Sequence, residues 1–506
     1  MRKQSRIDLV FVSLKQQTTH RMEEQIIEPA ELTQIRPSKR QLQWQQLEFY
    51  GFIHFGLNTM TNREWGLGNE SPTVFYPQKL DCHQWVSTMK QSGMQGIILT
   101  CKHHDGFCLW PSQHTAFTVA STPWRNGQGD LVKELSDACR QAELKFGIYL
   151  SPWDQHEACY GMGQAYDDFY TAQLTELLTN YGDIFEIWLD GANGEGPNGK
   201  RQNYDWERYY QVIRELQPNA VIAVCGPDVR WVGNEAGQTR LQEWSVVPAA
   251  LKDAEKTASH SQKADSTAIR QSISSMEMDL GSRQALKKYG IKEAAELAWY
   301  PAEVNLSIRP GWFYHPSEDQ QVKSGAELWS FYKQIVGGNS SFLLNVPPMP
   351  DGMIHPTDQK ALQQLGHSIK QLKEVTAERT GTFASSSTSV SSRMDKLQLS
   401  QAFGQYWKPD LEDKRPWLTL HFAEPVVINS LVLKEAIQYG QRVEKAKIFL
   451  QTVEGQKLLT EIVTIGYQKI ISFEAVGVSA VKIVFTQVRQ TPIIQTMVAR
   501  YVPQEE

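Results

Sequence analysis

Short apolar and β-branched runs alternate with amphipathic helical patterns from about residue 50 to residue 375. Strands that are buried on both faces read as continuous apolar runs, and their alternation with helices is typical of parallel β/α units. Eight runs have this character, which is the number that a closed parallel barrel needs. They are Tyr50–Gly56, Gly96–Lys102, Lys145–Ser151, Phe185–Asp190, Ala220–Gly226, Trp244–Val247, Ala302–Ile308 and Ser341–Val346.

The segments between these runs carry one apolar stripe each, with apolar residues at three- and four-residue steps. Clear examples run from Leu131 to Ala142, from Tyr170 to Tyr181 and from Trp206 to Ile213. Asp130 is predicted to cap the first of these helices, and Gly182 to end the second. Because no Gly-rich dinucleotide loop follows the first strand, the pattern favours an α/β fold of the (β/α)8 TIM-barrel type over an open doubly wound sheet.

Beyond Val375 the pattern changes to alternation with a period of two, as at Leu418, Leu420 and Phe422. Such runs, separated by turns, predict a C-terminal antiparallel β-sandwich. Three segments are therefore expected: a disordered leader over residues 1–30, a barrel over 31–372 that includes a polar insertion on its rim over 249–284, and a sandwich over 373–506.

Composition narrows the class of protein. The chain has 506 residues with 51 basic and 56 acidic side chains, so a net charge of −5 argues against nucleic acid as a partner. No apolar run is long enough to cross a membrane. The six cysteines show no CxxC spacing, and Asp8 interrupts the apolar stretch of the N-terminus. Free thiols and the lack of a signal-peptide pattern predict a cytoplasmic location.

Chemistry is expected at the carboxyl ends of the barrel strands. Asp190 closes an apolar strand and precedes Gly191–Gly194, whose small residues leave room for a substrate. An isolated aspartate at this position often only begins a turn. The other strand ends also carry polar or aromatic side chains, and this favours a functional role for Asp190. The candidates at these ends are His54, His103, His104, Tyr149, Trp153, Asp190, Glu235, Glu303 and Trp312.

The adjacent pair His103 and His104 is compatible with two kinds of site. Imidazoles bind zinc, but neighbouring strand residues point to opposite faces, and no His-x-His or His-Glu-x-x-His pattern accompanies the pair. Neutral imidazoles that donate hydrogen bonds to sugar hydroxyls fit better, so no metal and no cofactor are expected. The alternatives are a metal-dependent barrel hydrolase that uses these histidines, His54 and Asp190, and a non-catalytic carbohydrate-binding protein.

Four tryptophans are candidates for contact with a ligand, although large aromatic residues are usually buried in the core. Trp231 and Trp312 stand in loops beside Gly, Asn, Pro and Arg, Trp153 stands near the end of the third predicted strand, and Trp65 is the fourth candidate. Aromatic faces stack on the C–H side of sugar rings. This set therefore indicates a carbohydrate site.

Six strings, in this order along the chain, resemble the α-L-fucosidases of glycoside hydrolase family 29. They are Ile53-His-Phe-Gly56, Lys102-His-His-Asp-Gly-Phe107, Gly147-Ile-Tyr-Leu-Ser-Pro-Trp-Asp154, Ile187-Trp-Leu-Asp-Gly-Ala192, Gly233-Asn-Glu-Ala-Gly237 and Ser307-Ile-Arg-Pro-Gly-Trp-Phe-Tyr-His315. Two C-terminal strings, Tyr406-Trp-Lys-Pro409 and Trp417-Leu-Thr-Leu-His-Phe422, resemble discoidin-like sugar-binding sandwiches.

The resemblance implies a retaining exo-α-L-fucosidase that removes terminal fucose from oligosaccharides or glycoconjugates. It implies that Asp190 is the nucleophile and that Glu235 is the acid/base, as in the branch that acts on α-1,3/1,4-linked fucose. Residues that bind the sugar in the family match His54, His103, His104, Tyr149 and Trp312, and Glu303 and Arg309 match a family string without an assigned role. Together with the tryptophans singled out above, these residues make the set of expected substrate-binding residues. That set is His54, Trp65, His103, His104, Tyr149, Trp153, Trp231, Glu303, Arg309 and Trp312.

Overall fold

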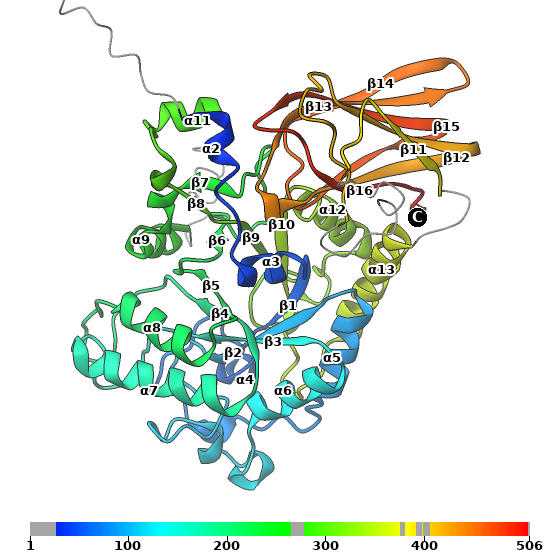
Figure 1. Ribbon diagram of the computed structural model, residues 1–506. Coiled ribbons are helices and arrows are strands. Elements are labelled where there is room, and N and C mark those ends of the chain that lie inside the picture. Colours follow the sequence, from blue (N-terminus) through cyan, green and yellow to red (C-terminus); the bar gives the residue numbers. More distant parts are fainter. Residues whose placement is uncertain (1–26, 265–277, 375–379, 391–396, 398–404, 504–506) are drawn as a thin grey trace, which may run out of the picture.

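The computed structural model describes residues 27–264, 278–374, 380–390, 397 and 405–503. The predicted leader lies outside the described residues except at its end, where Ile27 is buried and helix α2 (Pro29–Leu32) begins. The protein consists of a parallel barrel followed by an antiparallel β domain (Figure 1).

Eight parallel strands form the barrel sheet, in the order β5-β4-β3-β2-β1-β10-β9-β6. A parallel bridge between Ala223 and Val229 brings β5 close to β6, so the sheet is nearly closed. This confirms the predicted barrel. The strands are β1 (Phe49–Ile53), β2 (Gly96–Lys102), β3 (Lys145–Leu150), β4 (Ile184–Leu189), β5 (Val221–Val224), β6 (Arg230–Trp231), β9 (Ala302–Ser307) and β10 (Ser340–Asn345).

The predicted sixth barrel strand, Trp244–Val247, is wrong. The sixth strand is β6, which has only two residues and pairs with β9. The apolar run at Val246 belongs to β7 (Val246–Pro248), which pairs with β8 (Leu297–Trp299) in a separate two-stranded sheet. This small sheet packs against the N-terminal segment around Leu32, so its side chains are buried outside the barrel.

Helices cover the outside of the barrel, and their ends follow local sequence signals. The Asp130 carboxylate accepts a hydrogen bond from the Lys133 amide and caps α6, as predicted. Gly182 follows the end of α7 with a φ of +83°, a conformation that glycine adopts without strain. The main helices are α3 (Lys39–Gln45), α4 (Leu57–Thr61), α5 (Cys82–Gln91), α6 (Leu131–Gln141), α7 (Gln164–Asn180), α8 (Trp206–Leu216), α12 (Gly325–Ile335) and α13 (Pro356–Lys373).

The described part of the polar segment over residues 249–284 lies outside the barrel sheet. Its described part contains α9 (Ala254–Ala264) and the beginning of α11 (Arg283–Lys288). In Figure 1 both helices lie beside β7 and β8, on the same side of the molecule as α2.

Alternate residues of the strands point into the barrel and stack in layers, because side chains of a strand alternate between its faces. On β4 and just beyond it these residues are Glu186, Trp188 and Asp190. Glu303 on β9 accepts a hydrogen bond from Trp188 and another from Tyr50 on β1, which joins the layers across the barrel. The deepest layer is therefore polar and the next is aromatic, with Asp190 above both.

The C-terminal domain is the predicted antiparallel β-sandwich, built as one hydrogen-bonded sheet of six strands. Register shifts interrupt the pairing of its two longest strands, β12 and β15, and such irregularities bend strands. Leu418, Leu420 and Phe422 lie in its core, as their period-two spacing predicts. The strands are β11 (Thr382–Ser385), β12 (Trp417–Glu435), β13 (Val443–Thr452), β14 (Gly455–Ile462), β15 (Lys469–Val488) and β16 (Ile494–Arg500).

A buried cluster of charges joins the sandwich to the barrel. Glu48, just before β1, contacts Lys434 of β12 at 2.6 Å and Lys373 of α13 at 3.0 Å. Burial alone would raise the pKa of the Glu48 carboxyl, but the two ammonium groups hold it well below its usual range. Arg500 of β16 also donates to the carbonyl oxygen of Leu372. The two domains therefore meet in a buried and specifically bonded interface.

All six cysteines are free thiols, and five of them are buried. Within the described residues, no helix combines the length and the apolar composition that crossing a membrane requires. The cytoplasmic location stays a prediction.

Candidate active site

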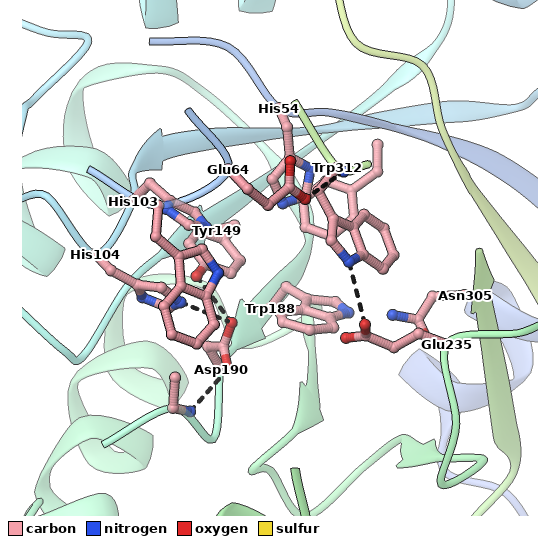
Figure 2. Close-up of a pocket in the computed structure, with 13 residues that line it drawn as sticks. His54, Glu64, His103, His104, Tyr149, Trp188, Asp190, Glu235, Asn305 and Trp312 are labelled. Atoms are coloured by element: carbon pink, nitrogen blue, oxygen red, sulfur yellow. Dashed lines mark hydrogen bonds and ion pairs between the residues drawn. The ribbon is translucent and has the colours of Figure 1, made fainter. Parts of the chain in front are cut away.

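A pocket that is open to solvent at its mouth lies at the carboxyl ends of the barrel strands. Eight of the predicted site residues line it (Figure 2). The lining consists of Phe52, His54, Glu64, Trp65, His103, His104, Tyr149, Trp188, Asp190, Ala192, Glu235, Asn305 and Trp312.

Asp190 is held from several sides. Its Oδ2 atom accepts a hydrogen bond of 2.8 Å from the Tyr149 hydroxyl, and its Oδ1 atom one of 2.8 Å from the Ala192 amide. His104 Nε2 lies 3.9 Å from Oδ2. Burial and the nearby Asp190 charge raise the pKa of Tyr149 well above its usual value, so the hydroxyl keeps its proton and donates it in this bond. The carboxylate is thus oriented toward the pocket.

Glu235 lies in the loop that follows β6 and faces the same pocket. Its Oε2 atom accepts a hydrogen bond of 3.1 Å from the indole Nε1 of Trp312. In Figure 2 the ring of Trp188 lies between Glu235 and Asp190. The pocket therefore offers two carboxyl groups, one on each side of the Trp188 ring, which we call the aromatic floor of the pocket.

Glu64 is a third carboxylate in the lining, and sequence reasoning missed it. It accepts hydrogen bonds from the backbone amides of Trp312 and Phe313, and His315 Nε2 lies 3.0 Å from Oε2. Glu64 follows the short helix α4 and not a strand. The expectation that functional residues stand at the carboxyl ends of the strands therefore does not include it. The adjacent Trp65, one of the four candidate tryptophans, is the signal that the sequence offers at this place.

The other missed lining residues are Phe52, Trp188, Ala192 and Asn305. Phe52 and Trp188 precede the predicted residues His54 and Asp190 by two positions, so they share their face of the sheet. The period-two rule, applied two residues before His54 and Asp190, therefore predicts Phe52 and Trp188 as lining residues too.

The three pocket histidines are neutral hydrogen-bonding groups. His54 Nδ1 pairs with Asn345 Oδ1 at 2.8 Å, and His104 Nδ1 with the Ser151 hydroxyl at 2.7 Å. Burial lowers the pKa of His54 to about 3 and lowers the pKa values of His103 and His104 as well. A neutral ring has one N–H donor and one acceptor, a combination that suits hydroxyl groups.

We expect these three rings to remain neutral at pH 5.5, about one unit below the ordinary histidine pKa. Burial disfavours the charged form, so protonation begins only as the pH falls toward the lowered values. Nitrogen-15 NMR of histidine-labelled protein measures this, with His54→Gln, His103→Gln and His104→Gln used to assign the signals. Imidazolium shifts for these signals at pH 5.5 would contradict the prediction.

Three further predicted residues lie outside the lining but contact it. Trp153 packs against Trp65 and His104, with ring centroids 5.8 and 4.8 Å apart. Trp231 donates a hydrogen bond of 3.0 Å to Asn305 Oδ1, and Glu303 lies beneath the pocket. All three side chains are buried, and their polar atoms form hydrogen bonds with other residues of the protein.

Arg309 also lies outside the pocket, with its side chain fully buried. Its guanidinium forms two hydrogen bonds of 2.8 and 2.9 Å with the Asp358 carboxylate at the start of α13, and a third with Asp319. The arginine therefore connects the loop after β9 to α13.

Replacing Arg309 with leucine should lower the free energy of unfolding by about 3–5 kcal/mol, because Asp358 would be left as an unpaired buried charge. Chemical denaturation measures this. An Arg309→Leu variant of normal stability but with a raised KM would instead indicate a contact with substrate.

Among the described residues, no group of three or more His, Cys, Asp or Glu side chains is arranged to hold a metal ion. His103 and His104 lie side by side with ring centroids 4.1 Å apart, while Nδ1 of His104 is engaged with Ser151.

Comparisons with known proteins agree on one family. A family model for α-L-fucosidases matches residues 69–374. The chain is 40% identical to α-L-fucosidase 1 of Arabidopsis thaliana over 472 residues, which cover 90% of this chain and 86% of the relative.

Two solved structures resemble the whole molecule. A glycoside hydrolase 29 family member from an unknown rumen bacterium is 35% identical with a TM-score of 0.74, covering 93% of this chain and 78% of that one. A Ruminococcus gnavus GH29 fucosidase solved in complex with fucose is 26% identical with a TM-score of 0.77, covering 93% and 95%. The chain is therefore a glycoside hydrolase and belongs to the α-L-fucosidases of family 29.

Proposed function

We propose that the enzyme is a retaining exo-α-L-fucosidase that hydrolyses terminal α-1,3/1,4-linked fucose, with Asp190 as nucleophile and Glu235 as acid/base. The observation that carries this assignment is the pair of carboxyl groups in one pocket with different surroundings. Asp190 accepts hydrogen bonds from a hydroxyl and an amide, whereas an indole donates to Glu235.

The reaction takes two displacements. In the first, an Asp190 oxygen attacks the anomeric carbon, the glycosidic C–O bond breaks, and Glu235 gives its proton to the leaving oxygen. In the second, the Glu235 carboxylate takes a proton from water, the water oxygen attacks the same carbon, and the bond to Asp190 breaks. Two inversions leave free fucose in the α configuration, with Glu235 protonated again.

The rest of the pocket suits a neutral deoxysugar. The neutral rings of His54, His103 and His104 can donate to or accept from hydroxyl groups. Trp65 and Trp312 offer aromatic faces to the C–H groups of the ring. Tyr149 keeps Asp190 in place without removing its charge.

The direct test is incubation with a Lewis-type trisaccharide that carries α-1,3- or α-1,4-linked fucose. We expect free fucose by chromatography and α-fucose as the first product by proton NMR. An α-1,2-linked fucosyl oligosaccharide serves as the control for linkage and should be cleaved much more slowly. First formation of β-fucose would contradict the retaining mechanism, and equal rates would contradict the linkage preference.

A metal-dependent hydrolase that uses the histidines and Asp190 is the competing mechanism. We expect dialysis against a chelator to leave kcat/KM unchanged, because every proton and charge in the proposed steps is supplied by Asp190, Glu235 and water. Activity that disappears with the chelator and returns with zinc would favour the metal mechanism.

A further inference from the structure

Two carboxyl groups meet inside the barrel beneath the pocket. Glu186 of β4 and Glu303 of β9 are both fully buried and lie within hydrogen-bonding reach of each other. Trp44 Nε1 donates to Glu186 Oε2 at 2.7 Å, and the Tyr50 hydroxyl donates to Glu303 Oε2 at 2.5 Å. Trp188 Nε1 donates to Glu303 Oε1 at 2.8 Å.

The surroundings of this pair cannot support two negative charges. The groups that act on the Glu303 carboxyl are Glu186, Tyr50 and Trp188, none of which carries a positive charge. Two carboxylates in contact in a dry interior repel each other strongly, so one of them takes up a proton. Burial and the mutual charge accordingly raise the pKa of Glu186, and burial raises that of Glu303.

One atom of the pair needs such a proton. Among the described residues, Glu186 Oε1 is buried without a hydrogen-bond donor. A buried polar atom without a partner is costly, and a proton held between Glu186 and Glu303 would remove that cost. The indole and phenol N–H and O–H groups then stabilise the single remaining charge.

We propose that Glu186 and Glu303 share one proton and that this pair positions Trp188 as the floor of the active site. Glu303 Oε1 fixes the indole N–H of Trp188. The Trp188 ring stacks on Tyr149 with centroids 5.5 Å apart and an interplanar angle of 27°, and Tyr149 donates to Asp190. The pair is thus linked to the nucleophile through two aromatic residues, without touching substrate itself.

The chain of contacts explains why two acidic side chains occupy the barrel core. Glu186 and Trp188 project to the same side of β4 as Asp190, so the acid pair, the aromatic floor and the carboxylate form successive layers. If the shared proton were lost, repulsion would separate the two carboxylates and remove the acceptor of Trp188. The ring of Trp188, which lies between Asp190 and Glu235 in Figure 2, would then move.

Infrared difference spectroscopy tests the shared proton without any assay of activity. With carboxyl-labelled glutamate at pH 9, the wild-type protein should show a protonated-carboxyl band that is absent in Glu186→Gln and in Glu303→Gln. At that pH Glu435, another buried glutamate of the described residues with a raised pKa, of about 7, is ionised. The matched control is Glu207→Gln, which removes an exposed glutamate and should keep the band. A wild-type spectrum without this band would overturn the shared proton.

Kinetics test the positioning role, which rests on the proposed fucosidase function. Glu303→Gln keeps an acceptor for Trp188 and an N–H toward Glu186, so kcat should stay within about threefold of wild type. Glu303→Leu leaves the indole N–H unpaired, and kcat should fall at least about tenfold. A wild-type kcat for Glu303→Leu would overturn the positioning role. If the wild-type enzyme released no fucose, the proposed function would fail while the infrared result would still decide the proton.

Discussion

Replacing Asp190 with alanine is expected to lower kcat on every fucoside by at least about 10,000-fold, as the loss of a nucleophile does in other hydrolases. The side chain lies at the end of β4, where Tyr149 and the Ala192 amide hold its carboxylate toward the pocket. Without it, no covalent fucosyl intermediate forms, and the quality of the leaving group does not matter. Steady-state rates on a trisaccharide and on an aryl fucoside measure this loss.

A small external anion provides the decisive control for Asp190→Ala. Azide fits the space left by the carboxylate and should restore part of the rate with aryl fucosides, because it attacks the anomeric carbon from the same side. One inversion then gives β-fucosyl azide, which NMR distinguishes from the α product. A variant that keeps wild-type turnover would remove Asp190 from the nucleophile role, and α-fucosyl azide would contradict single displacement.

The barrel could be predicted because most of its strands are continuous apolar runs that end in a recognisable loop. The exception shows the limit of the method. β6 has only Arg230 and Trp231, too short for any periodic signal, while the stronger apolar pattern near Val246 belongs to a small sheet outside the barrel. Sequence patterning detects burial, and it does not tell which core a buried strand belongs to.

The site could be predicted where a reactive side chain stands directly at a strand end, as at His54 and Asp190. Glu64 escaped because loop contacts with Trp312, Phe313 and His315 bring it to the pocket. Arg309 shows a limit of the opposite kind. Its string resembles those of known enzymes, but its side chain is turned to Asp358, and the direction of a loop side chain depends on tertiary contacts.

Glu235→Ala should divide substrates according to their leaving groups. In natural disaccharides the departing sugar is a poor leaving group as an alkoxide and needs a proton. The kcat/KM on these substrates should therefore fall by about 100- to 10,000-fold. Aryl fucosides with strongly acidic leaving groups need no proton, and their first step should remain within about tenfold of wild type. Because the same residue activates water in the second step, the intermediate should accumulate, with a burst of phenol seen in rapid-mixing experiments.

Glu64 is the matched control, because it is the other glutamate of the pocket lining. Two backbone amides and His315 approach its carboxylate, so it acts as an acceptor that ties two loops together and is poorly placed to deliver a proton. Glu64→Gln should therefore reduce activity to the same extent on good and poor leaving groups. Glu235, with an indole donor at one oxygen, should alone show dependence on the leaving group. If Glu64→Gln showed that dependence and Glu235→Ala did not, the acid/base role would pass to Glu64.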